Sequence, residues 1–115
     1  MEKEEDVNFE TYEESAGKTA IYPDRGNTLI YPALKLAGES GEVAEKVGKM
    51  LRDDAGVLTD KRRDDLIKEL GDVLWYVAAL CHELKVPMAE VAQLNIDKLN
   101  SRKERNVLTG DGDDR

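Results

Sequence analysis

Two long stretches of the chain, residues 30–52 and 59–84, repeat apolar side chains every three or four positions. This spacing places the apolar side chains along one face of an α-helix, whereas a strand would alternate every second residue. The six residues between the stretches break the pattern and are rich in Asp and Gly. A connection this short is typical of two helices that pack side by side in opposite directions.

Two further helices are expected, from Asn8 to Ala20 and from Pro87 to about Arg105, because Pro87 suits a first helical turn. Thr59 or Asp60 can cap the long helix that ends near residue 84. No stretch reads as a convincing strand, so the sequence predicts an all-α fold with an antiparallel four-helix bundle core. The expected organisation is a flexible N-terminus at 1–7, a helical domain at 8–107 and an irregular acidic tail at 108–115.

Charge and residue usage exclude several classes of function. The 115 residues carry 17 Lys and Arg against 25 Asp and Glu, a net charge of -8, which argues against binding nucleic acid or an anionic membrane surface. No apolar run approaches the roughly 18 residues of a membrane span, and the acidic start is unlike a signal peptide. One cysteine, Cys81, and one histidine, His82, exclude a disulfide framework and a multi-histidine metal site. We therefore expect a cytoplasmic protein.

A repeated pentapeptide carries the clearest chemical signal. Residues 39–43 read ESGEV and residues 69–73 read ELGDV, so each long helix has two acids three positions apart on the flank of its apolar face. Packing those faces together would collect four carboxylates, which suit Mg²⁺ or Mn²⁺. For either pair alone a solvated helix edge is the simpler interpretation, but the repetition favours a metal site. The predicted ligands are Glu39, Glu42, Glu69 and Asp72.

The last predicted helix offers the opposite charge. Asn95 lies within its apolar stripe, and Lys98 and Arg102 follow on the same side. An amide and two cations beside an acidic metal cluster fit a polyphosphate bridged to metal ions. A buried Asn that sets helix register, with two basic side chains at the edge of the stripe, explains the spacing equally well.

Taken together, these motifs resemble those of the MazG-like nucleotide pyrophosphohydrolases. The pairs Glu39-x-x-Glu42 and Glu69-x-x-Asp72 match the ExxE and ExxD signature of that family, and residues 95–102 read NIDKLNSR in the expected order. The resemblance extends from about Tyr12 to Arg115 and is strongest to short single-domain forms of phages and bacteria.

The resemblance implies an all-α dimer, or a dimer of dimers, that hydrolyses a (deoxy)nucleoside triphosphate to the monophosphate and pyrophosphate for nucleotide-pool control. It implies Mg²⁺ or Mn²⁺ on Glu39, Glu42, Glu69 and Asp72, with Glu39 or Glu42 as the proton acceptor. It places Lys98 and Arg102 on the phosphates and Asn95 near metal or nucleotide. A purine substrate of the dGTP type is expected, in the host cytoplasm if the protein is phage-encoded.

Two features depart from the family pattern, and one alternative function stays open. Some relatives have a further acid where this chain has Gly38, and many have glycine where it has Asn106. A non-catalytic helical dimerisation module would explain the amphipathic helices but not the repeated acids. A di-iron bundle would need Glu-x-x-His pairs, and the position three before His82 is Ala79.

Oligomerisation is also predicted from the apolar surface. The apolar faces of 30–52 and 59–84 are expected to be used up within one chain. Trp75 lies off those faces, so we expect it at a contact between subunits, with stacking on the nucleotide base as the alternative.

Overall fold

The computed structural model describes residues 6–115, and within that range it contains helices and no strand. The all-α prediction is therefore confirmed, and each predicted helix is present within a few residues of its expected bounds. The helices are α1 (Phe9–Thr19), α2 (Ile30–Asp53), α3 (Asp60–Leu84) and α4 (Met88–Glu104). Most of the predicted N-terminal segment 1–7 lies outside the described residues.

Local capping explains where the helices begin and end. The side chain of Asn8 accepts a hydrogen bond from the backbone N–H of Thr11, and the hydroxyl of Thr11 accepts one from the backbone N–H of Asn8. Thr59, one of the two predicted caps, accepts from the N–H of Arg62 at the start of α3. Lys85 ends α3 in the left-handed conformation, and Pro87 precedes α4. These contacts satisfy backbone groups that a bare helix end would leave unpaired.

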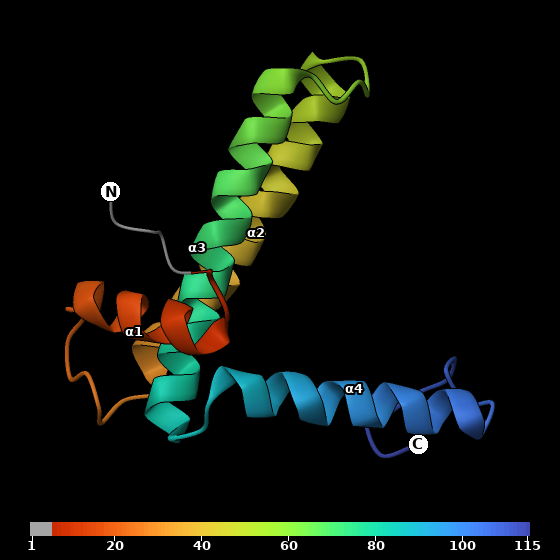
Figure 1. Ribbon diagram of the computed structural model, residues 1–115. Coiled ribbons are helices and arrows are strands. Elements are labelled where there is room, and N and C mark those ends of the chain that lie inside the picture. Colours follow the sequence, from red (N-terminus) through yellow and green to blue (C-terminus); the bar gives the residue numbers. More distant parts are fainter. Residues whose placement is uncertain (1–5) are drawn as a thin grey trace.

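The helices α2 and α3 form a long antiparallel hairpin (Figure 1). Ala55 and Gly56, both with positive φ, make the tight turn between them. Across this turn the Arg62 side chain contacts Asp54, with 2.9 Å between Nε and Oδ2, and both side chains are largely buried. A shielded pair with this geometry is stronger than an exposed one, so it holds the closed end of the hairpin.

The core lies at the other end of the hairpin, where α1 packs against α3 and the start of α4. Its buried members are all small or flexible: Ala16, Ala78, Cys81 and Met88. Trp75 packs against this core and donates from Nε1 to the hydroxyl of Thr19 on α1, at 2.9 Å. Trp75 therefore has a partner within its own chain, because α1 covers the side of α3 that the helical wheel left unassigned. Its expected contact between subunits stays a prediction.

Helix α4 does not lie along the hairpin but leaves its end at a large angle, so the molecule has an L shape (Figure 1). The radius of gyration is 17.4 Å, compared with about 13 Å for a compact chain of this length. The described residues thus make a bundle of two long helices with α1 across one end. A bundle of four helices side by side would need a further helical surface packed against this hairpin.

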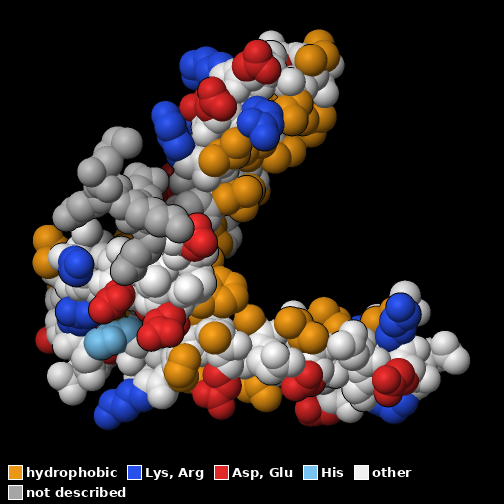
Figure 2. All heavy atoms as spheres, viewed as in Figure 1, with side chains coloured by type: hydrophobic (Ala, Val, Ile, Leu, Met, Phe, Trp, Pro, Cys, Tyr) orange, Lys and Arg blue, Asp and Glu red, His pale blue; other side chains and the backbone are white. Residues whose placement is uncertain are grey.

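The apolar faces of α2 and α3 are not used up within the chain, contrary to the prediction. Leu70 and Ile67 on α3 are 56% and 50% exposed, and Leu94 on α4 is 61% exposed. Figure 2 shows hydrophobic side chains along the sides of the two arms that face each other across the L. Because burying such surface is favourable by about 25 cal/mol per Å², this face is suited to contact with another apolar surface.

None of the helices described for residues 6–115 is long and apolar enough to cross a membrane.

Candidate metal centre

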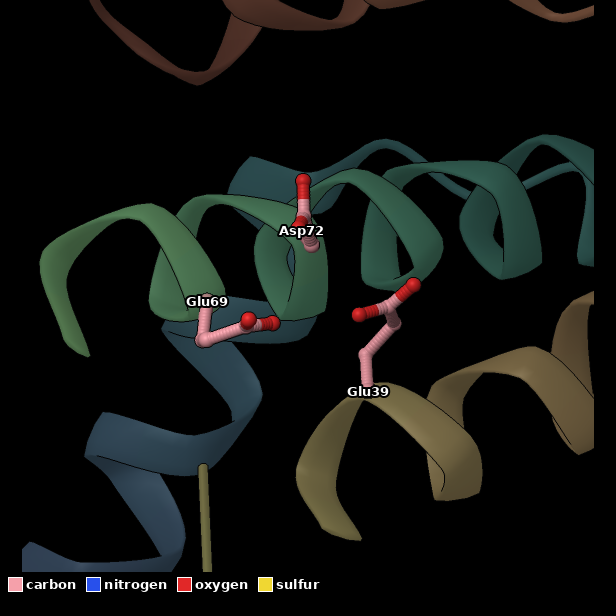
Figure 3. A group of neighbouring side chains, drawn as sticks. All are labelled: Glu39, Glu69 and Asp72. Atoms are coloured by element: carbon pink, nitrogen blue, oxygen red, sulfur yellow. The ribbon is translucent and has the colours of Figure 1, made fainter. Parts of the chain in front are cut away.

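Three of the four predicted metal ligands come together near the middle of the hairpin. Glu39 on α2 and Glu69 on α3 point toward one another, and Asp72 stands on the next turn of α3 (Figure 3). One carboxylate oxygen from each lies within 4.8 Å of the others. The antiparallel pairing of α2 and α3 creates this cluster, since it sets the acidic flank of one helix against that of the other.

Glu42, the fourth predicted ligand, lies beside this cluster rather than within it. Its side chain is exposed, yet it is close enough to hydrogen-bond with Glu69 and to raise the pKa of that carboxyl. The predicted set of four is therefore assembled as a group of three with Glu42 at its edge.

Two carboxylate oxygens of the cluster are shielded from water. Glu39 Oε2 and Glu69 Oε2 are buried and have no hydrogen-bond partner among residues 6–115. Burial, followed by the charges of Glu42 and Asp72, raises the pKa of Glu39. Burial, followed by the hydrogen bond and charge of Glu42, raises the pKa of Glu69. An unpartnered buried carboxylate is costly, and a hard divalent cation with oxygen ligands removes that cost, so these residues fit Mg²⁺ or Mn²⁺.

Tyrosines that sequence reasoning did not select border the cluster. The pKa of Tyr76 is raised by burial, then by its neighbour Tyr31, then by the charges of Glu39 and Asp72. The pKa of Tyr12 is raised by burial and by Asp72. The sequence did indicate that Tyr76 lies near Asp72, because it follows Asp72 by about one helical turn. Tyr12 on α1 carried no such signal, because only tertiary packing brings it to α3.

The glycines of the two motifs are open to solvent in the chain. A Cβ atom at Gly41 or Gly71 would meet no atom within 4 Å outside its own helix. The described residues therefore show no packing reason for a glycine at either position. These positions leave flat, accessible patches on α2 and α3 beside the acidic cluster.

The predicted phosphate-binding residues do not reach the cluster of their own chain. Asp72 lies 12 residues before the end of α3, roughly 18 Å along the helix, and Lys98 lies 10 residues into α4, roughly 15 Å along it. Because α4 leaves α3 at a large angle, the length along each helix adds to the separation between the acidic cluster and Lys98 (Figure 1). Asn95 is exposed, while Lys98 and Arg102 contact the C-terminal residues instead.

Comparison with known proteins agrees with the motifs. Residues 29–107 match the family model of the MazG nucleotide pyrophosphohydrolase domain. The chain is also 48% identical over 114 residues to the Gene 37 protein of Mycobacterium phage L5, which covers 95% of this chain and 100% of that protein. No solved structure matches the chain significantly.

Proposed function

Because the chain belongs to the family of MazG nucleotide pyrophosphohydrolase domains, we propose that it hydrolyses a (deoxy)nucleoside triphosphate to the monophosphate and pyrophosphate. The observation that carries this proposal is the acidic cluster of Glu39, Glu69 and Asp72, in which one carboxylate oxygen each of Glu39 and Glu69 is buried and unpartnered among the described residues. A helical interaction module has no use for such a cluster, since the charge repulsion within it destabilises the fold. The expected role is control of the nucleotide pool, with a purine substrate of the dGTP type.

Glu39, Glu42, Glu69 and Asp72 would hold Mg²⁺ or Mn²⁺. When bound, the ion would neutralise charge on the α-phosphate and on the pyrophosphate leaving group. Without such an ion the acids weaken the binding of a triphosphate at the complete site, because both carry negative charge. Glu39 or Glu42 accepts the proton of the attacking water.

Each complete site is proposed to use two copies of the chain. In one copy, α4 directs Lys98 and Arg102 away from the acidic cluster (Figure 1). Their proposed role on the phosphates, and that of Asn95 near metal or nucleotide, then requires the α4 of a second copy. The exposed apolar sides of the two arms support this assembly, because they offer a surface on which that α4 could pack. The assembly is at least a dimer, and two dimers would make a tetramer.

A screen of the dNTPs and NTPs with Mg²⁺ or Mn²⁺, detecting released pyrophosphate, tests the reaction. We expect one or a few nucleotides to yield monophosphate and pyrophosphate, and the variants Glu42→Gln and Asp72→Asn to lose most turnover while remaining folded. Diphosphate and inorganic phosphate as products would contradict the proposed bond cleavage.

Thermal unfolding distinguishes the enzyme from the interaction module. Mn²⁺ should raise the melting temperature of the parent protein, because an ion that binds only the folded state stabilises it. Asp72→Asn should weaken this response. A parent protein indifferent to both metals would favour the non-catalytic module.

A further inference from the structure

The residues after α4 form a defined structure although they contain no helix or strand. We name residues 107–115 the C-terminal strap, which turns back beside the end of α4 (Figure 1). The guanidinium group of Arg115 organises it by donating to three backbone oxygens of the strap itself. The acceptors are those of Val107 at 3.1 Å, Leu108 at 2.9 Å and Gly112 at 2.6 Å.

Gly110 permits this compact arrangement. Its φ is +138°, and a Cβ atom at this position would lie 3.2 Å from Cδ of Arg115. Any other residue would therefore meet both backbone strain and contact with the organising side chain. The strap is a specific fold around Arg115 rather than a free tail.

The strap covers Arg102, which is only 5% exposed. Nη2 of Arg102 donates to the backbone oxygen of Asp113 at 2.6 Å and, more weakly, to that of Gly112 at 3.4 Å. Its Nε is buried with no partner among the described residues. A buried guanidinium with an unpaired donor is incompletely satisfied, so a ligand that offers more acceptors would bind it better.

One carboxylate of the strap lies between the two cations assigned to phosphate. Oδ1 of Asp113 is 3.4 Å from Nζ of Lys98 and 3.6 Å from Nη2 of Arg102. The charge of Lys98, followed by its hydrogen bond and by Arg102, lowers the pKa of Asp113. The Asp113 side chain is 88% exposed, so its ion pairs are weak and water can reach them.

We infer that the C-terminal strap is an autoinhibitory contact, in which the Asp113 carboxylate occupies the anion position between Lys98 and Arg102 that a polyphosphate must take over. A polyphosphate brings several charges and many acceptor oxygens, whereas Asp113 brings one carboxylate, so the exchange favours the polyphosphate. Taking the place of Asp113 requires the strap to move, and this movement exposes Arg102. The inference rests on the proposed function only for the identity of the anion as the phosphates of a nucleotide.

Two neighbouring acids provide a matched pair of variants. Asp113→Asn removes the competing carboxylate, and Asp114→Asn removes the same charge from an exposed residue for which no ion pair is seen within residues 6–115. The full chain is titrated calorimetrically with sodium tripolyphosphate at low ionic strength, without divalent metal. We expect Asp113→Asn to bind about two- to five-fold more tightly than the parent, and Asp114→Asn to bind like the parent. Equal affinities for the two variants, or no binding by any of the proteins, would overturn the inference.

Hydrogen exchange provides a second readout that does not depend on a variant. Saturating tripolyphosphate should speed the exchange of the Val107 amide, which donates to the backbone oxygen of Arg102 at 2.8 Å, because the strap leaves its position. Slowed or unchanged exchange in the bound protein would show that the strap closes over the anion or does not respond, and would overturn the inference. Neither measurement requires turnover. A protein without pyrophosphohydrolase activity would therefore refute the proposed function, while these two measurements would still test the autoinhibitory role of the strap.

Discussion

The carboxylate of Glu13 on α1 accepts a hydrogen bond from the backbone N–H of Met88, the first residue of α4. The first amides of a helix have no partner within the helix, and a negative charge there interacts favourably with the helix dipole. This contact joins the two helices that flank the core and sets the point from which α4 leaves the hairpin.

Glu13→Ala is expected to destabilise the protein by about 1–2 kcal/mol, because it leaves a partly buried N–H without its acceptor. Urea unfolding at a fixed protein concentration measures the change. Glu14→Ala provides the control, since Glu14 is exposed on the same helix and should change stability by no more than about 0.5 kcal/mol. Equal effects of the two substitutions would contradict this role of Glu13.

The acidic cluster should make the metal-free protein less stable as the pH rises. Burial and Glu42 raise the pKa of Glu69 above its ordinary 4.5. The folded state then binds more protons than the unfolded state between the two pKa values, so this contribution to stability is present below about pH 4.5 and is lost as the pH rises through the folded pKa. Glu69→Gln should flatten this part of the pH profile, as measured by unfolding in the presence of a chelator.

Glu45 supplies a control of opposite sign for that experiment. Its ion pair with Lys49 lowers the pKa of Glu45, so its contribution is present above the unfolded pKa and is lost as the pH falls. Glu45→Gln should therefore leave the loss of stability at rising pH in place. A profile that is unchanged by Glu69→Gln would contradict the pKa shift assigned to the cluster.

Leu70 is expected to lie at the contact between copies, because it is 56% exposed and belongs to the apolar face of α3. Light scattering of the parent protein should show at least a dimer at micromolar concentration. Leu70→Gln should raise the dissociation constant by about ten-fold or more, as expected for loss of a buried leucine at an interface. Lys68→Gln, on an exposed position of the same helix, should leave the mass unchanged. A monomeric parent protein would contradict the two-copy site.

Mixing two inactive variants tests whether the site is shared. If the acids and the cations of one site come from different copies, co-expressed Asp72→Asn and Lys98→Ala chains should regain activity. About one quarter of the sites would combine an intact acidic cluster with an intact cation, as random pairing in a symmetric dimer requires. Activity that stays at the level of the separate variants would place the acids and cations of each site in one chain.

The sequence by itself determined the helices and the chemical character of the site. The predicted cap Thr59 begins α3, Pro87 immediately precedes α4, and the repeated acids lie where α2 and α3 meet. These features depend on spacings of three or four residues and on single capping groups. Such local rules act within one or two helical turns and can be read without knowledge of distant contacts.

Only the tertiary structure decided how the helices are placed relative to one another. A hydrogen bond between Glu13 and Met88, which are 75 positions apart, holds the start of α4 against α1. The loop before α2 is held by Glu83, which accepts from Tyr22 and Gly26. The same kind of distant contact gave Trp75 a partner within the chain and laid the strap over Arg102. A helical wheel shows which side of a helix is apolar, but the partner of that side depends on long-range packing, which no local spacing encodes.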